Sequence, residues 1–400
     1  MNDSIVLISK DILTKLYLPL YGNKYWNTPN IDALAAKGTI FKRHYTSAPS
    51  TAMSFTSMLT GKYPYQLNRK RYETVKKIDD SETLFWKLQQ MGYETHILWG
   101  YGFFEDITQY ANCYGDEKKT VFHNLDIGQD VGPHFFDKRI ISRDDNLTDK
   151  TISLIKKAIE GIANSNKKVF LWIHLPHVLL GREAYGSDID LLDQVVGYLR
   201  NKFSDDSIFI TADHGNMNGK NGVFAYGFDV YEPAINIPLI TPRLENQSVV
   251  NHPTSNTQLE DIILNRKIPK PEYIISDSAY YAQPNRKTAI VKENYKYIYN
   301  KKDKSEELYD LHLDPLENIN LLKQSFKDPD RKVTYRQQEV AYYPFQDKVS
   351  DIHKQMVEIK NTFWKKGNIN EELFYKIRKL LSIGYNNIKA LVSDIFASKK

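Results

Sequence analysis

The sequence of 400 residues is long enough for two domains, or for one large domain with an appendage. Its apolar fraction of 41% supports a sizeable core, and its formal net charge of +5 is too small to indicate nucleic-acid binding. Cys113 is the only cysteine, which excludes an intramolecular disulfide and a thiolate zinc site.

Targeting signals are missing from the sequence. Residues 1–4 lead directly into a short apolar run, without the basic region and cleavage site of a signal peptide. No apolar stretch approaches the roughly 20 residues that a membrane helix needs. We therefore expect a cytoplasmic protein with no membrane span.

The first elements expected are a strand and a helix. Residues 5–8 form a continuous apolar run, which is typical of a strand buried on both faces, and Asp11 follows it. Residues 29–38 predict a short helix that ends at Gly38.

Residues 46–61 are the most unusual stretch, because hydroxyl side chains are dense in it. We expect a loop at residues 47–50 and a helix that starts near Thr51. A hydroxyl at a helix N-terminus lies where backbone N–H groups and the helix dipole favour an anion. Such a position is also typical of an ordinary Ser or Thr N-cap, so the stretch alone leaves both roles open.

The middle of the chain alternates helices with apolar strands. The predicted helices cover residues 81–91, 149–162 and 188–203, and the predicted strands cover residues 95–98, 169–173 and 208–211. Residues 101–148 predict irregular loops around an active site. Helices between apolar strands indicate an α/β protein with a doubly wound, mostly parallel sheet.

Polar side chains follow three of the predicted strands. Asp11 follows the first strand, His174 and His177 follow residues 169–173, and Asp213 and His214 follow residues 208–211. Ligands bind at the carboxyl ends of strands in open α/β sheets, so we expect these side chains to converge. Carboxylate oxygens and imidazole nitrogens are suitable ligands for a divalent metal.

The C-terminal third of the chain has a different pattern. After a strand at residues 235–242, the expected short strands lie at residues 273–276, 287–291, 295–300 and 307–310. We expect a catalytic domain at residues 1–250, a small antiparallel β subdomain at 251–325 and a helical, Lys-rich extension at 326–400. The extension predicts a docked appendage or a homodimer contact, with a membrane-surface or polyanion role as the alternative.

Six motifs, in the family's order, resemble the sulfatases of the alkaline phosphatase superfamily. The motifs are Asp11 with Gly22, residues 28–38, residues 46–61, residues 174–177, residues 211–215, and residues 307–321. The resemblance covers about residues 4–322 and implies the α/β fold of that superfamily.

The nucleophile position departs from the sulfatase pattern. Sulfatases carry Cys or Ser in a Cys/Ser-x-Pro-Ser-Arg motif, and that residue is oxidised to formylglycine. At family spacing the position falls on Thr51, which is not a formylglycine precursor, and the Pro and Arg are missing. Ser47 and Ser50 are the alternatives. A Thr nucleophile resembles the branch that contains phosphoethanolamine transferases and lipoteichoic acid synthases.

That branch implies a single-metal site in this chain. Its ligand pattern matches Asp11, Thr51, Asp213 and His214, and a further Asp-x-x-x-His for a second metal is not found after His177. The resemblance therefore implies one divalent metal ion, with Zn, Mn, Ca and Mg all open.

The resemblance also implies roles for nearby residues. Thr51 would attack the phosphorus, while His174 or His177 would contact the anion or protonate the leaving oxygen. Lys220 is a candidate anion contact, and a solvated loop lysine explains its position equally well.

The function expected is that of a metal-dependent hydrolase or transferase acting on the phosphate group of an anionic substrate. That substrate would be a small molecule or a glycan- or nucleotide-linked compound, and no nucleic-acid partner is expected. Two alternatives stay open. One is a sulfuric-ester hydrolase, and the other is a catalytically inactive member that binds an anion or a glycan.

Overall fold

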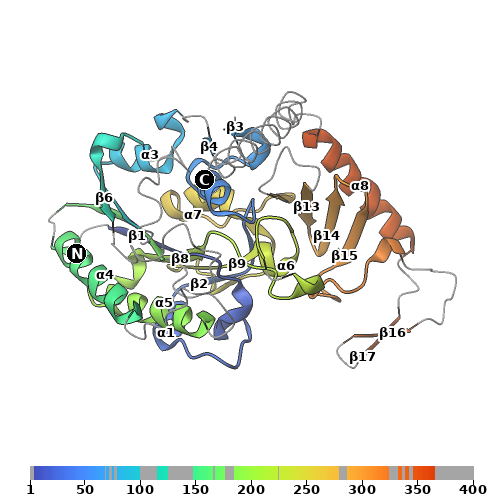
Figure 1. Cartoon of the computed structure of the whole chain (residues 1–400), viewed down its shortest axis with the longest axis horizontal. Helices are drawn as coiled ribbons and strands as arrows, with labels where there is room; N and C mark the ends of the chain where they lie inside the picture. Colours follow the sequence, from blue (N-terminus) through green and yellow to red (C-terminus); the bar gives the residue numbers. More distant parts are fainter. Residues whose placement is uncertain are drawn as a thin grey trace, which may run out of the picture.

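The computed structural model shows a large central sheet with helices on both faces and a smaller sheet beside it (Figure 1). The structure describes residues 4–67, 69–71, 74–75, 79–99, 115–124, 147–164, 167–175, 184–223, 225–278, 286–323, 332–335, 338–341 and 346–364.

The central sheet has the strand order β10-β2-β9-β8-β1-β7-β5-β6, with β11 also paired to β2. Its strands are β1 (Ile5–Lys10), β2 (Thr39–Tyr45), β5 (Glu94–Trp99), β6 (Thr120–Asn124), β7 (Val169–Leu175), β8 (Ile208–Ala212), β9 (Asn236–Thr241), β10 (Val249–Val250) and β11 (Thr254–Ser255). Only β9 runs antiparallel to its neighbours, β2 and β8. The prediction of a doubly wound, mostly parallel sheet is therefore confirmed.

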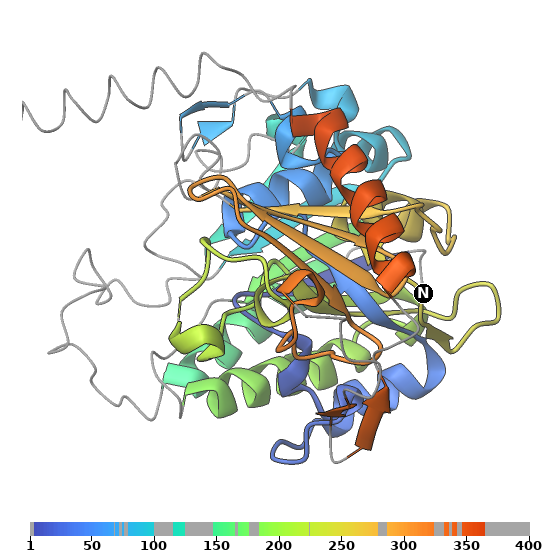
Figure 2. The ribbon, with the colours of Figure 1, turned by 90° about the vertical axis from the view of Figure 1, so that its right-hand side faces the viewer.

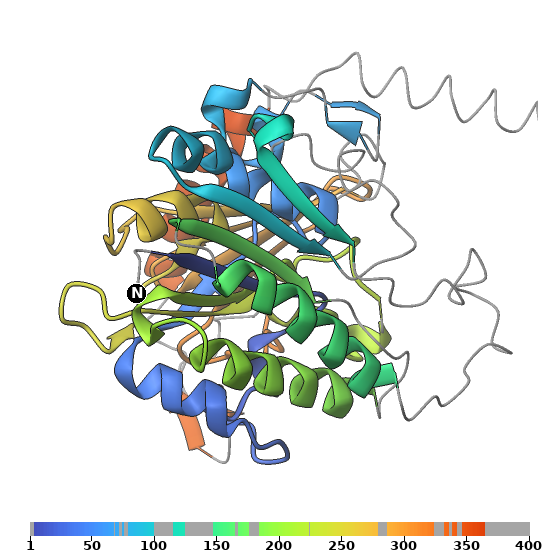
Figure 3. The ribbon, with the colours of Figure 1, turned by 90° about the vertical axis from the view of Figure 1, so that its left-hand side faces the viewer.

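Helices cover the two faces of this sheet in separate layers (Figures 1 and 3). One layer contains α1 (Pro29–Lys37), α4 (Leu147–Ala163) and α5 (Ala184–Arg200), and the other contains α2 (Thr51–Thr60), α3 (Leu84–Gln90) and α7 (Leu259–Leu264). Successive residues of β1 supply the two cores in turn, because side chains alternate across a strand. Val6 and Ile8 face the first layer, whereas Ile5 and Leu7 face the second.

Two helix boundaries have clear local causes. Helix α3 begins at Leu84 rather than at Ser81, because the Thr83 side chain accepts a hydrogen bond from the Trp86 N–H and caps the helix. Helix α1 ends before Gly38, where an added Cβ would lie 2.1 Å from the Thr241 carbonyl oxygen of β9. Only glycine allows this approach of helix end and strand.

A small antiparallel sheet lies beside the central one (Figure 2). It contains β12 (Ile274–Asp277), β13 (Lys287–Lys292), β14 (Tyr295–Asn300) and β15 (Glu306–Asp310), as the sequence predicted. Helix α8 (Gln346–Trp364) packs on it, with Met356 and Phe363 buried against Tyr297 and Leu308. The remaining short elements are α6 (Glu232–Ile235), β3 (Arg69–Arg71) and β4 (Thr74–Val75).

The predicted helical extension is only partly correct. Strands β16 (Lys332–Tyr335) and β17 (Gln338–Ala341) pair as a two-stranded sheet, so the expectation of helix from residue 326 is wrong there. Val333, Tyr335 and Val340 are residues of types that favour strands. Residues 365–400, on which the predicted dimer contact falls, lie outside the described residues. None of the described helices combines the length and the apolar character needed to cross a membrane.

A buried charge triad joins the small sheet to the main domain. The Lys296 Nζ of β14 lies 2.7 Å from Glu317 Oε1 and 3.2 Å from Glu232 Oε1 of α6. The Glu232 N–H also donates to Glu317 Oε2 at 2.7 Å. Burial raises the pKa of Glu317 to about 7, and the Lys296 charge opposes this shift. Three segments of the chain therefore depend on one buried ammonium group.

This arrangement predicts a large cost for removing that charge. We expect Lys296→Met to lower the free energy of unfolding by about 3 kcal/mol, because two buried carboxylates lose their counter-charge. The control is Lys37→Met, which removes a 68% exposed lysine paired with Asp205 and should cost less than about 1 kcal/mol. Urea denaturation measures both changes, and equal effects would contradict the role given to the triad.

Candidate active site

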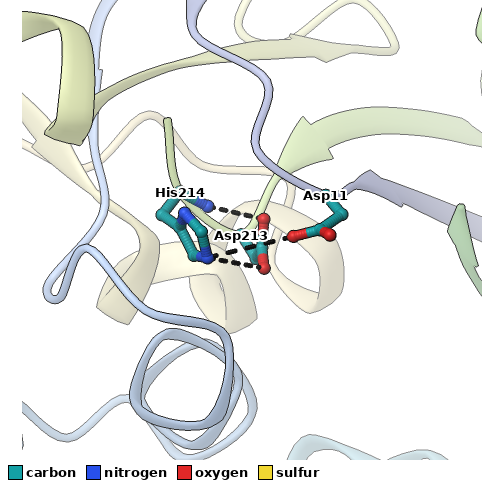
Figure 4. Close-up of side chains that lie close together, drawn as sticks. All are labelled: Asp11, Asp213 and His214. Atoms are coloured by element: carbon teal, nitrogen blue, oxygen red, sulfur yellow. Dashed lines mark hydrogen bonds and ion pairs between the residues drawn. The ribbon is translucent and has the colours of Figure 1, made fainter. Parts of the chain in front are cut away.

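Asp11, Asp213 and His214 converge at the carboxyl ends of two neighbouring strands (Figure 4). Strands β1 and β8 are paired in parallel, with Lys10 opposite Ala212, so the residues that follow them must lie side by side. One ligand atom from each of the three lies within 4.8 Å of the other two, and all three side chains are buried. In the part of the chain that the structure describes, no other group of three such residues meets this criterion.

The orientation of His214 exposes one ring nitrogen to the cluster. Its Nδ1 lies 2.9 Å from the Gly215 carbonyl oxygen, which can only accept, so Nδ1 carries the proton. In the neutral ring, Nε2 then carries a lone pair that can accept a hydrogen bond or bind a cation. This atom lies 3.1 Å from Thr51 Oγ1, 3.3 Å from Asp213 Oδ2 and 3.9 Å from Asp11 Oδ1.

The turn after β1 is shaped to hold Asp213. Ile12 has φ of 57°, a left-handed conformation that costs free energy for a β-branched residue. In this conformation its N–H donates to Asp213 Oδ1 at 3.2 Å, and the His214 N–H donates to the same oxygen at 2.7 Å. The other oxygen of Asp213, Oδ2, accepts no hydrogen bond from the described residues.

These residues fit a divalent cation. Two carboxylates and an imidazole lone pair face one another in a buried space, where an uncompensated negative charge is costly. Burial, with the nearby Asp11 charge adding to it, raises the pKa of Asp213 to about 7. Oxygen and imidazole donors suit Zn²⁺ and Mn²⁺. The Gly215 carbonyl also holds the His214 ring in the orientation that a ligand needs.

Thr51 is the first residue of helix α2, as the sequence predicted. Ser50 precedes it and makes no side-chain capping bond, so the first N–H groups of the helix remain suited to an anion. Among the hydroxyl candidates, Thr51 has its Oγ1 beside His214 Nε2. Ser47 is buried, and its N–H donates to Asn256 Oδ1 instead.

A buried hydrogen-bond network, which the sequence pattern did not indicate, ties helix α2 to the backbone of Asp213 after β8. Ser54 Oγ donates to the Asp213 carbonyl at 2.6 Å, and it also contacts Thr46 Oγ1 at 2.9 Å and Asn256 Nδ2 at 3.0 Å. The spacing of one helical turn from Thr51 could have indicated Ser54. Nothing in the sequence points to Asn256, which is brought here only by the fold.

His174 is close to the cluster but fully buried. Its ring stacks on Trp99 with a centroid distance of 4.9 Å, and its Nδ1 lies 2.9 Å from Ser9 Oγ. Burial lowers the pKa of His174 to about 3, so the ring is neutral near pH 7. A neutral ring suits a hydrogen bond to an anion better than proton donation.

The two other predicted residues are not brought into the cluster by the described structure. The Lys220 ammonium donates to the carbonyl oxygens of Leu316 and Glu317 at 2.6 and 2.8 Å and to Asn318 Oδ1 at 3.2 Å. Its role as an anion contact stays a prediction. His177 lies outside the described residues.

Comparisons with known proteins agree with this fold. Residues 3–178 match the family model described as Sulfatase. N-acetylgalactosamine-6-sulfatase from Canis lupus familiaris is 25% identical over 279 residues, covering 56% of this chain and 53% of that protein. The chain spans about half, or less, of the length of the curated relatives that it matches.

Solved structures extend the likeness to most of the chain. A 2-O GAG sulfatase matches with a TM-score of 0.68 and 15% identity, covering 90% of this chain and 92% of that chain. The phosphonate monoester hydrolase of Agrobacterium radiobacter matches with a TM-score of 0.63 and 14% identity, covering 90% and 96% of the two chains. Such low identities show a shared fold alone. Residues 3–178 therefore resemble the Sulfatase family, and the chain shares the fold of these solved structures.

Proposed function

We propose that this protein is a metal-dependent phosphoric-ester hydrolase or phosphotransferase that uses Thr51 as its nucleophile. The observation that supports it best is the position of Thr51 Oγ1, 3.1 Å from the Nε2 of His214 and at the start of a helix. A hydroxyl beside a set of cation ligands, with helix N–H groups next to it, suits attack on an anionic ester.

The cation site is assigned to Asp11, Asp213 and His214. A divalent ion there would supply positive charge beside the nucleophile and beside the oxygens of the reacting group. The protein's own part is to hold these ligands and Thr51 in place. Ile12 and Gly215 orient Asp213 and His214 through their backbone groups.

The proposed reaction has two steps at phosphorus. Thr51 gives its proton to solvent water and attacks in line, so that the Oγ1–P bond forms as the bond to the leaving oxygen breaks. N–H groups at the start of α2 stabilise the equatorial oxygens, and the leaving oxygen takes a proton from His177 or from water. Water, or an acceptor hydroxyl, then attacks the phospho-threonine and releases Thr51.

The identity of the nucleophile favours phosphorus over sulfur. A formylglycine hydrate can expel sulfate by collapsing to the aldehyde, whereas a sulfated threonine has no such route and requires attack by water. The phosphonate monoester hydrolase among the structural neighbours is consistent with chemistry at phosphorus on this fold.

A sulfuric-ester hydrolase is the second candidate, because the curated relatives are sulfatases that share part of this chain's sequence. A third candidate is an inactive member that binds an anion or a glycan. The comparison of phosphate and sulfate esters separates the first two candidates, and the presence of turnover separates both from the third.

Thr51 substitutions test the nucleophile. We expect Thr51→Ala to lower turnover of bis-p-nitrophenyl phosphate at least about a thousandfold, because the attacking oxygen is removed. Thr51→Ser keeps that oxygen and should stay within about tenfold of wild type. Steady-state assays with bound metal measured in every variant give the result. Faster turnover of p-nitrophenyl sulfate than of the phosphodiester in the wild type would contradict the proposal.

The raised pKa of Asp213 makes metal binding and stability depend on pH. Without metal, the free energy of unfolding should fall as the pH rises from about 4 to about 7. Over this range Asp213 keeps its proton in the folded state and has lost it in the unfolded state. Metal affinity should rise over the same window, up to about tenfold per pH unit, because metal and proton compete.

Melting temperatures at pH 5.5 and 7.5, with and without Mn²⁺, measure these changes. Asp213→Asn is the control, since it cannot ionise. We expect it to melt above metal-free wild type at pH 7.5 and to gain little from Mn²⁺. A metal response that does not change with pH in the wild type would show that Asp213 is not a ligand.

The Ser54 network should control the position of Thr51. Ser54→Ala removes the hydroxyl that donates to the Asp213 carbonyl and takes one of its partners from Asn256 Nδ2, so we expect about 1–3 kcal/mol of lost stability and a lower kcat with KM nearly unchanged. Ser57→Ala is the matched control, because Ser57 is buried in the same helix and its Oγ makes no hydrogen bond among the described residues. Equal effects of the two changes would contradict this role.

A further inference from the structure

A buried lysine ends the strand that leads to Asp11. Lys10 is the last residue of β1 and is only 1% exposed. Because side chains alternate across a strand, Lys10 lies on the same face as Val6 and Ile8, which pack in the core of α1, α4 and α5. An ammonium group in such surroundings costs free energy unless it is paired and hydrogen-bonded.

The Lys10 ammonium contacts one carboxylate and one peptide group. Its Nζ lies 3.4 Å from Asp188 Oδ1 of α5, and the Asp188 side chain is buried as well. The same Nζ donates to the backbone carbonyl oxygen of Asp11 at 3.2 Å. Replacing a buried ion pair with apolar side chains is often neutral for stability, or even stabilising. Stability alone therefore does not explain this pair, and the contact with the Asp11 carbonyl gives it a second role.

The peptide group between Asp11 and Ile12 is held on two opposite sides. In a trans peptide the carbonyl and the N–H point in opposite directions. Here the carbonyl oxygen accepts from Lys10 Nζ, and the Ile12 N–H donates to Asp213 Oδ1 at 3.2 Å. The peptide dipole therefore has its negative end toward the ammonium and its positive end toward the Asp213 carboxylate, so both charges favour this orientation.

This orientation is the one that strains the turn. Ile12 has φ of 57°, and rotation of the peptide before it would return the residue to a relaxed, negative φ. The same rotation would turn the Ile12 N–H away from Asp213. The Asp11 N–H donates to the Leu175 carbonyl of β7 at 3.0 Å. The sheet thus fixes the chain as far as this N–H, and Lys10 acts on the peptide group that follows.

We propose that Lys10 is a positioning residue, which holds the Asp11–Ile12 peptide in the orientation that prepares Asp213 to bind a cation. Asp188 holds the ammonium, the ammonium holds the carbonyl, and the N–H of the same peptide holds the carboxylate. This proposal rests on the proposed function, because it concerns the cation site assigned there. Lys10 has the same sign of charge as the cation, so it acts through position and not through attraction.

The direction of the change in cation affinity separates position from charge. If Lys10 acted by charge alone, its removal would tighten cation binding, because like charges repel. Loss of a contact that orients a metal ligand instead weakens binding, typically by roughly tenfold to a hundredfold. The main variant is Lys10→Met/Asp188→Asn, which leaves no unpaired charge in the buried site. Lys10→Met alone is the second variant, for which charge alone predicts still tighter binding.

Calorimetry with Mn²⁺ on the 400-residue protein measures this effect without turnover. We expect both variants to bind Mn²⁺ roughly tenfold to a hundredfold more weakly than wild type. Asp213→Asn identifies the part of the binding that belongs to the cation site. Lys296→Met is the matched control, because Lys296 is also a buried lysine, and it pairs with Glu232 and Glu317. It should keep the wild-type affinity although it loses stability.

Melting temperatures show that each variant is folded at the temperature of the titration. Equal or tighter Mn²⁺ binding by the folded Lys10 variants would overturn the positioning role and leave the proposed function standing. An equal loss of affinity in Lys296→Met would show that Lys10 contributes only to general stability, which also overturns it. A wild type that binds Mn²⁺ no better than Asp213→Asn would overturn both the positioning role and the cation site of the proposed function.

Discussion

The rest of this structure depends on the charge that Asp11 and Asp213 place in a buried space. The two carboxylates and the His214 ring lie together at the ends of β1 and β8. Burial raises the pKa of Asp213 to about 7. Such a group is stable only with a proton or a cation. The strained backbone of Ile12 is kept because its N–H holds Asp213 in this place.

The elements around Asp11, Asp213 and His214 hold the Thr51 hydroxyl beside these residues. Helix α2 begins at Thr51, and Ser54, one turn later, ties the helix to the backbone of Asp213. The small sheet is fixed to the same domain through Lys296. The geometry of the nucleophile is thus set by packing and buried hydrogen bonds over the whole domain.

The cation ligands could be predicted from sequence because a parallel sheet brings strand ends together. Asp11 and Asp213 both follow apolar runs, and the parallel pairing of β1 with β8 brings the two residues together. Contacts between distant segments left no such pattern, so Asn256 beside Ser54 and Tyr226 on His214 were missed. Residues 332–335 and 338–341 were expected to belong to a helical extension, but they pair as a two-stranded sheet.

The most direct test of this account is a rapid-quench experiment with peptide mass mapping. The metal-loaded protein is mixed with a phosphate diester, quenched in acid within milliseconds and digested. The account predicts a phosphoryl adduct on Thr51, which forms before product is released into solution. Turnover with an adduct on Ser47 or Ser50, or with none on the peptide that contains Thr51, would contradict it.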